Sequence, residues 1–147
     1  MKLREGVRAA WARLRGGEVT AWRAAASVAV GVFIGVTPLW GTHVFLVLAV
    51  CLPLRLDARI AFVGSNVSLP FIAPFLTLAE IQLGALARTG ATLPIDRATL
   101  ASHGLAAFAV DLAVGTAVLA PTAALVMGGV TWLAVTMMHR RRRALVK

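Results

Sequence analysis

The acidic and histidine side chains inside long apolar stretches are the residues of this sequence best able to do chemistry. Glu80 lies in the middle of one such stretch, Asp111 lies seven residues into another, and His43 lies in a third. An ionised carboxylate at membrane depth costs at least about 2.5 kcal/mol on insertion scales, so it must be paired, protonated or next to water. Its candidate partners are His43, His103 and Arg88. The alternative is that both carboxylates lie near a membrane interface.

The elements that position these side chains are three long apolar blocks, at residues 24–53, 60–87 and 104–138, and residues 24–54, 60–79 and 112–138 carry no acidic or basic residue except His43. Each reaches the roughly 20 residues that a helix needs to cross a bilayer core. Of the 147 residues, 59% are hydrophobic and 14% are charged, against about 25% charged residues in soluble domains. No short apolar run followed by a cleavage site resembles a removable leader. The sequence therefore predicts an all-α integral membrane protein.

The basic residues are concentrated near the two ends of the chain. The formal charge is +9, with six basic residues before position 24 and five after position 138. A soluble protein this basic would suggest nucleic-acid binding, but basic clusters that flank apolar spans mark the cytoplasmic side of a membrane protein. We therefore expect the lipid bilayer as partner, no nucleic acid, and both termini in the cytoplasm.

Three regions follow from this pattern: a basic amphipathic segment at 1–23, a helical membrane domain at 24–138 and a basic cytoplasmic tail at 139–147. In the first region Leu3, Val7 and Trp11 form an apolar stripe, and Arg4 and Arg8 fall on a neighbouring face. That arrangement favours a helix lying in the headgroup region. The alternative is a short cytoplasmic helix packed on the rest of the protein.

Proline interrupts each apolar block. Pro38 and Gly41 lie near the middle of the first, Pro70 and Pro74 lie in the second, and Pro121 lies in the third. As one straight helix, residues 24–53 would be about 45 Å long, against a core of about 30 Å. Proline-broken helices that form re-entrant or short helical hairpins are therefore predicted.

The connectors at 55–59 and 88–103 are both mildly basic. If both are cytoplasmic, each apolar block leaves the cytoplasmic side and returns to it. The alternative is a multi-pass arrangement with four or more full spans.

Small residues recur every four positions at Ser27, Gly31 and Gly35. Such spacing puts them on one helix face, where two helix backbones can approach closely. The pattern predicts helix packing within the chain, and homodimerisation is the alternative.

Polar and aromatic residues gather around the predicted breaks. Broken helices that meet near mid-membrane form the substrate and ion sites of secondary transporters, although side chains there also cap the broken backbone. The candidate residues lining a solute or lipid site are Thr37, Trp40, His43, Asn66, Ser68, Glu80 and Asp111.

Motifs of known catalytic chemistry are absent from the sequence. It contains no nucleotide loop, HExxH, GxSxG or cysteine cluster, and Cys51 is its single cysteine. We therefore predict no catalytic residues, no metal site, no cofactor and no enzymatic activity. An intramembrane enzyme would have to use His43, Glu80 and Asp111.

Four motifs carry a family resemblance: Gly-Val-Phe-Ile-Gly-Val-Thr-Pro-Leu-Trp-Gly at 31–41, Leu-Arg-Leu-Asp at 54–57, Gly-Ser-Asn-Val-Ser-Leu-Pro at 64–70 and Gln-Leu-Gly at 82–84. Over residues 25–90 the chain resembles the bacterial domain-of-unknown-function family 2062. The resemblance implies a small multi-helix protein of the bacterial inner membrane, and some members are fused to glycosyltransferase-like domains. No activity is assigned to the family. The implied signature residues are Gly35, Pro38, Gly41, Asn66, Pro70, Pro74 and Gly84.

This chain departs from the family pattern at residues 42–43, 57 and 67. Thr42-His43 replaces the glutamine that many members have after Trp-Gly, Asp57 replaces an asparagine, and Val67 replaces a proline after Asn66. A polar site that depends on those amides is therefore not expected to be shared in full.

Together these patterns predict a non-enzymatic membrane protein that binds or translocates a small solute or lipid headgroup at its broken helices. The alternative is a membrane anchor or accessory subunit for enzymes of cell-envelope glycans or lipids, with such an enzyme or a second copy as partner.

Overall fold

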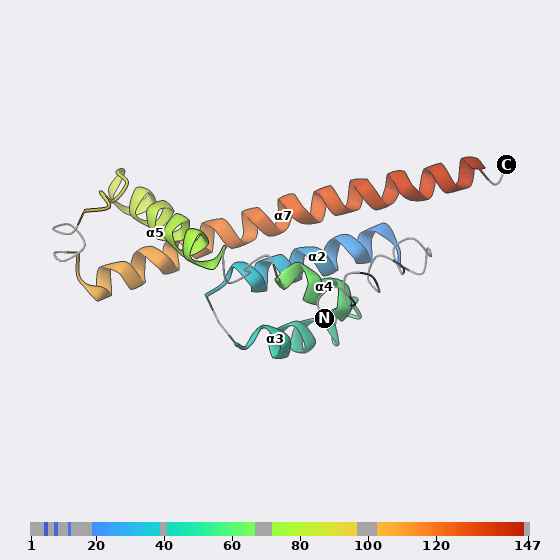
Figure 1. Ribbon diagram of the computed structural model, residues 1–147, viewed down its shortest axis with the longest axis horizontal. Coiled ribbons are helices and arrows are strands. Elements are labelled where there is room, and N and C mark those ends of the chain that lie inside the picture. The colour runs from blue at the N-terminus through green and yellow to red at the C-terminus, as the bar shows by residue number, and fades with distance from the viewer. Residues whose placement is uncertain are drawn as a thin grey trace.

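The structure, a computed structural model, describes residues 5, 8, 12, 19–38, 41–66, 72–96 and 103–145. Within these ranges the regular structure is helical throughout, which confirms the predicted all-α class. The amphipathic helix predicted within 1–23 lies mostly outside the described residues. The helices with defined bounds are α2 (Ala21–Val36), α3 (His43–Cys51), α4 (Ala58–Ser65), α5 (Ala73–Thr89) and α7 (Leu105–Leu145) (Figure 1).

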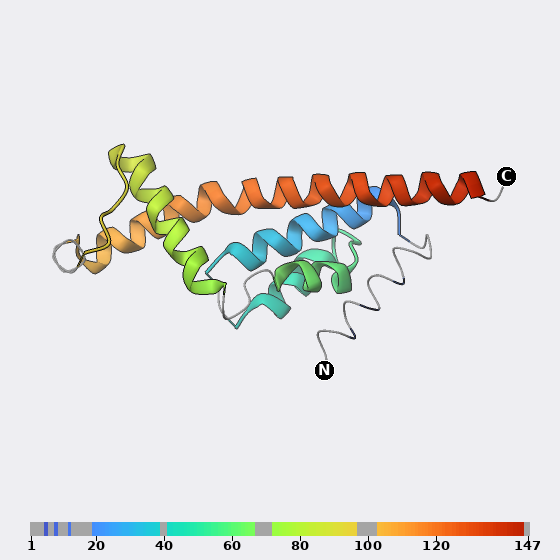
Figure 2. The same cartoon turned by 45° about the horizontal axis from the view of Figure 1, so that its top comes forward.

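Helix α7 is the longest element, and α2 lies along the half of it that leads to the C-terminus (Figures 1 and 2). Ala24 near the start of α2 shares a buried cluster with Val135, whereas Val36 at its end shares one with Ala120. The two helices therefore run antiparallel.

Helix α5 crosses the N-terminal part of α7 obliquely, with its chain direction opposed to that of α7 (Figure 2). Leu76 in its first turn packs against the cluster that contains Ala120, and Gly84 abuts the backbone of Asp111. The C-terminal end of α2 and the N-terminal end of α5 therefore both lie near Ala120, halfway along α7.

Helix α4 runs parallel to α2 at very short range. Three residue pairs make the contact: Ser27 with Asp57, Gly31 with Ala61, and Gly35 with Ser65. The Ser27 hydroxyl accepts a hydrogen bond from the Asp57 N–H at 2.9 Å. A Cβ atom added at Gly31 or Gly35 would overlap the carbonyl group opposite. The repeat of small residues thus faces α4 of the same chain.

Helix α3 connects α2 to α4 by returning alongside both of them (Figure 1). Helix α2 ends at Val36, Thr37 is extended, Gly41 has a φ of +86°, and α3 begins at His43. The positive φ at Gly41 is a conformation that favours glycine. The Asp57 carboxylate then caps α4 by accepting hydrogen bonds from two N–H groups of its first turn.

The prediction that proline interrupts the third apolar block is wrong. Pro121 lies inside α7, which continues as one helix from residue 105 to residue 145 and includes the described part of the basic tail. Proline removes one backbone donor, but neighbouring helices and local adjustments allow it inside apolar helices. Here α2 packs against α7 on both sides of this position, at Ala120 and at Ala123.

The two connectors that were expected to be cytoplasmic lie far apart in the fold. Arg55 accepts a hydrogen bond at its carbonyl from Arg23 in the first turn of α2, whereas Arg88 bonds Asp111 near the start of α7. These contacts lie at opposite ends of the molecule (Figure 1). The reason is that α4 and α5 run in the same direction, and the chain returns only through α7.

Much of the apolar surface is exposed. Among the described helices, α7 is the one that is long and apolar enough to cross a membrane. Only 22% of its most apolar 18-residue segment is buried against the rest of the protein. Phe45 on α3, Phe75 on α5 and Leu125 on α7 are each more than 70% exposed. Soluble monomers rarely expose contiguous apolar surface on this scale.

Adding one methyl group to a glycine on α7 tests the close packing of α5 on it. A Cβ at Gly115 would overlap the carbonyl of Glu80, whereas one at Gly129 would meet no atom within 4 Å. We expect Gly115→Ala to lower the free energy of unfolding by about 2 kcal/mol through overpacking. Gly129→Ala is expected to leave it unchanged or higher, because alanine favours helix.

Denaturant unfolding of both variants in detergent, followed by circular dichroism, measures the difference. Equal stability of the two variants would contradict the packing.

Candidate functional site

The Asp111 carboxylate is the centre of a buried polar cluster where α5 ends and α7 begins. Its side chain is 1% exposed. Arg88 in the last turn of α5 donates from Nη1 to Asp111 Oδ1 at 2.5 Å, and His103 Nε2 lies 2.7 Å from Asp111 Oδ2. Two of the three partners predicted for the carboxylates therefore contact Asp111. A buried carboxylate bonded at both oxygens fixes the geometry of this end of the molecule.

His103 is held in place from its other side as well. Its ring packs edge-on against Phe108, with ring centroids 4.7 Å apart. The imidazole side chain is 21% exposed and that of Arg88 is 39% exposed. The cluster thus connects a buried carboxylate to the surface through two basic side chains.

Glu80 lies two turns before Arg88 on the same face of α5. It is 1% exposed, and its Oε1 atom has no hydrogen-bond partner in the described part of the chain. The polar side chain next to it is Thr116 of α7, whose hydroxyl oxygen is also buried without a partner. Burial of an unpaired polar atom is costly, so this pair of side chains needs an explanation.

A reciprocal contact brings Glu80 and Asp111 into one seam. Gly84 of α5 abuts the backbone carbonyl of Asp111, and Gly115 of α7 abuts that of Glu80. On each helix the glycine follows the acidic residue by four positions, which is one helical turn. We call this contact, with Thr116, the α5–α7 seam. Sequence reasoning missed Thr116 and the seam, although the shared spacing of acid and glycine was a signal for it.

Gln82 fastens the chain that follows α5. Its side-chain amide donates to the carbonyl of Leu93 and accepts from the N–H of Leu93, both at 2.9 Å. One side chain thus satisfies both backbone groups of a residue outside any helix. This contact gives Gln82 of the Gln-Leu-Gly motif a structural role that the sequence alone did not assign.

The other predicted lining residues are not brought into one site. Thr37 donates to the carbonyl of Phe33 at 2.8 Å, and the Asn66 amide donates to that of Phe62 at 2.6 Å. Both bonds satisfy the last turn of a helix, which is the capping alternative. His43 Nε2 is buried without a partner in the described ranges. Trp40, Ser68 and Pro70 lie outside those ranges.

The predicted signature positions that are described lie at turns or close contacts. Pro38 and Gly41 lie between α2 and α3, and Pro74 lies in the first turn of α5. Gly35 and Gly84 are the sites of helix contact given above.

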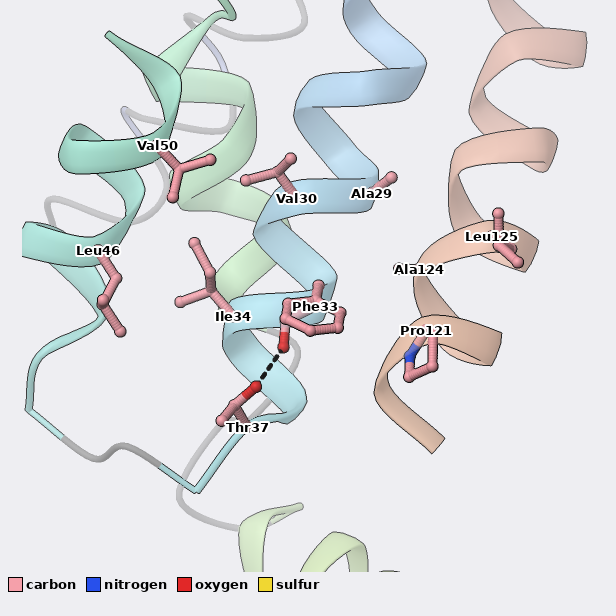
Figure 3. Close-up of a pocket in the computed structure, with 10 residues that line it drawn as sticks. All are labelled: Ala29, Val30, Phe33, Ile34, Thr37, Leu46, Val50, Pro121, Ala124 and Leu125. Atoms are coloured by element: carbon pink, nitrogen blue, oxygen red, sulfur yellow. Dashed lines mark hydrogen bonds between the residues drawn. The ribbon is translucent and has the colours of Figure 1, made fainter. Parts of the chain in front are cut away.

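An apolar groove runs along α2 and α7 on the face that also borders α3. Its first part, about 580 Å³, is an open hollow lined by α2, α3 and α7 (Figure 3), and its second part, about 460 Å³, continues between α2 and α7. The two parts share Ala29, Ala124 and Leu125. We call this the α2–α7 groove.

The lining of the groove is suited to hydrocarbon. Thr37 is its one hydroxyl-bearing residue, and that hydroxyl is bonded to the Phe33 carbonyl (Figure 3). Small side chains make the floor, and Trp22 and Trp132 stand at the far end of the second part. No group of three potential metal-binding side chains occurs among the residues that the structure describes. Sequence reasoning missed the groove, because alanines on two distant helices carry no local signal.

Removing Arg88 tests the Asp111 cluster. Arg88→Leu leaves the buried carboxylate with His103 as its one remaining partner, so we expect a loss of several degrees in unfolding temperature. Arg88→Leu combined with Asp111→Asn is expected to recover part of that loss, because the buried charge is gone. Thermal unfolding of the two single variants and the double variant measures the interaction between Arg88 and Asp111 as a double-mutant cycle. If the changes in unfolding temperature of the two single variants simply add in the double variant, the Arg88–Asp111 contact does not contribute to stability.

Comparison with known proteins places the chain in a family rather than beside a characterised relative. No curated protein and no solved structure matches it. A family model described as an uncharacterised protein conserved in bacteria, DUF2062, matches residues 7–144. The match extends well beyond residues 25–90, on which the sequence motifs lie, and covers nearly the whole chain. The chain therefore belongs to this family of uncharacterised bacterial proteins, DUF2062.

Proposed function

We propose that this protein is a non-enzymatic protein of the bacterial inner membrane that binds the hydrocarbon chain of a phospholipid in the α2–α7 groove. The observation that carries the proposal is the match between the groove and one leaflet of a bilayer. The groove extends along α7 from Pro121 to Trp132, which is about 16 Å at 1.5 Å per residue. Half of a hydrocarbon core of about 30 Å is nearly the same length.

Charged residues at two positions along the axis of α7 support the placement of the protein across a membrane. Arg23 bonds Arg55 next to the contact of Ala24 with Val135, towards the C-terminal end of α7 that carries Arg140, whereas Arg88 bonds Asp111 near the start of α7. Along α7 the separation from residue 111 to residue 140 is about 43 Å, close to the 40–45 Å of a bilayer with its headgroups. The exposed apolar side chains of α3, α5 and α7 described above lie between these levels and would face lipid.

In this position the chain would cross the membrane twice. Helices α2 and α3 form a hairpin that enters from the Arg55 end and returns to it. Helices α4 and α5 together make one interrupted crossing, and α7 makes the return. The Arg55 end holds most of the described arginines and would be cytoplasmic by the positive-inside rule, with the C-terminal end of α7 on that side.

The groove would then open in the cytoplasmic leaflet. Trp22 and Trp132 stand at its outer end, at the depth where tryptophan is enriched in membrane proteins. Arg140 follows Trp132 by two helical turns and is exposed, so an anionic phosphate there would meet positive charge. Charge and depth therefore favour a phospholipid as the occupant.

The second candidate is a helix of a partner protein, as expected for an anchor or accessory subunit. The observation that favours it is the small-residue floor of the groove, at Ala25, Ala29, Gly128 and Gly129, since small residues let helix backbones approach. The first part of the groove argues against it, because α3 closes that part on a third side and leaves a slot suited to a flexible chain.

Filling the groove tests the lipid proposal. We expect purified protein to retain about one phospholipid per chain, and Ala124→Leu to lower that retention several-fold because its side chain occupies the shared part of the groove. Val130→Phe is the matched control, since Val130 is 57% exposed on α7 and does not line the groove.

Native mass spectrometry from mild detergent gives the bound lipid, and thermal unfolding checks that both variants fold. Equal lipid retention by the two variants would exclude the groove as the lipid site. A stoichiometric protein partner that Ala124→Leu displaces, in place of lipid, would favour the accessory role.

Cysteine labelling tests the two-crossing arrangement. In a Cys51→Ala background, Ala91→Cys after α5 is expected to react with an impermeant maleimide in cells with a permeabilised outer membrane. Leu54→Cys, between α3 and α4, is expected to react only after the inner membrane is opened. The same labelling pattern at both positions would place the connectors on one side and contradict the arrangement.

A further inference from the structure

Glu80 is the largest fully buried side chain among the described residues, and neither the groove nor the Asp111 cluster uses it. It lies about one turn deeper than Asp111 along α7, opposite Gly115. Its Oε1 atom and the Thr116 hydroxyl oxygen both lack hydrogen-bond partners within the described ranges. The Thr116 hydroxyl is close enough to act on the Glu80 carboxyl, yet neither oxygen makes a hydrogen bond of ordinary geometry in this part of the chain.

The charged groups around Glu80 are already engaged with each other. On α5 the nearest one along the same face is Arg88, which bonds Asp111. On the α7 side they are Asp111 itself and His103, which are also bonded together. The start of α5 packs through Leu76 against an apolar cluster of α2 and α7. No described cation is thus bonded to the Glu80 carboxylate.

The choice of ligand follows from this environment. An ionised carboxylate buried without a partner costs several kcal/mol, and at membrane depth the cost is of similar size. A bound divalent cation would need about six oxygen ligands, whereas the seam offers one carboxyl and one hydroxyl, and the helical carbonyls are used in the helices. A proton needs one oxygen and removes the charge.

We propose that Glu80 and Thr116 form a proton-binding site in the α5–α7 seam, closed when the carboxyl is neutral and opened to water when it loses its proton. In the closed state the protonated carboxyl lies next to the Thr116 hydroxyl. On opening, the O–H bond of the carboxyl breaks, the proton passes to water that enters from the Arg88 end, and the carboxylate becomes hydrated. The proposal does not depend on what occupies the groove.

Opening is expected to part the helices, because their backbones touch at the seam and Glu80 is buried there. Gly84 and Gly115 bring the two backbones into direct contact, so a water molecule next to Glu80 requires α5 to move away from α7. Protonation is thereby coupled to the position of α5. The neutral, closed seam is expected to persist at low pH and to loosen as the pH rises.

Infrared spectroscopy of the full-length protein in nanodiscs detects the proton directly. We expect a carbonyl band of a protonated carboxylic acid at neutral pH, unchanged in Asp111→Asn and lost in Glu80→Gln. Absence of the band from the unmodified protein, or its persistence in Glu80→Gln, would overturn the proposal.

Hydrogen exchange of backbone amides measures the opening. The measured quantity is the exchange rate of the α5 amides, corrected for the intrinsic effect of pH. As the pH is raised, we expect this rate to increase at least tenfold more in the unmodified protein than in Glu80→Gln. Glutamine keeps the shape and cannot ionise, so identical pH profiles would overturn the coupling. The measurement is repeated with sodium and with potassium, and suppression of the opening by sodium alone would replace the proton with a metal cation.

Discussion

The close approach of helix backbones at glycine determines where the other parts of the molecule lie. Gly31 and Gly35 bring α4 against α2, and Gly84 and Gly115 bring α5 against α7. At these positions a side chain of any size would overlap a carbonyl group. The contacts rely on dispersion and shape rather than on a large buried core, which is how apolar helices associate when their surroundings are as apolar as they are. Small residues of α2 and α7 also line the α2–α7 groove, at Ala25, Ala29, Gly128 and Gly129.

Close packing also decides the environment of the polar side chains. Asp111 and Glu80 have the same relation to the seam, because each lies opposite a glycine of the other helix. Asp111 is near the end of α5, where Arg88 and His103 reach it, whereas Glu80 is a turn deeper and beyond their bonding distance. One turn of helix thus separates a carboxylate with two basic partners from one with none.

Local chemistry could be predicted from the sequence, and distant contacts could not. The helical class, the end of the first helix before Pro38 and the pairing of Asp111 with Arg88 and His103 follow from apolar runs, turn residues and the need to balance buried charge. Pro121 was misread because the loss of one backbone donor does not end a helix that α2 supports on both sides. The groove was not foreseen, since its alanines become neighbours only when α2 lies along α7. Thr116 was missed for the same reason.

Pro121 also has a mechanical consequence. Its missing N–H leaves α7 with one fewer backbone hydrogen bond at the level where α2 ends and α5 begins, and proline is a common site of helix bending. The C-terminal end of α2 and the first turn of α5 both pack against α7 at this level, so a bend there would move the two helices relative to each other. Because Pro121 is also part of the groove wall, the size of an occupant would influence the angle at which α7 bends there.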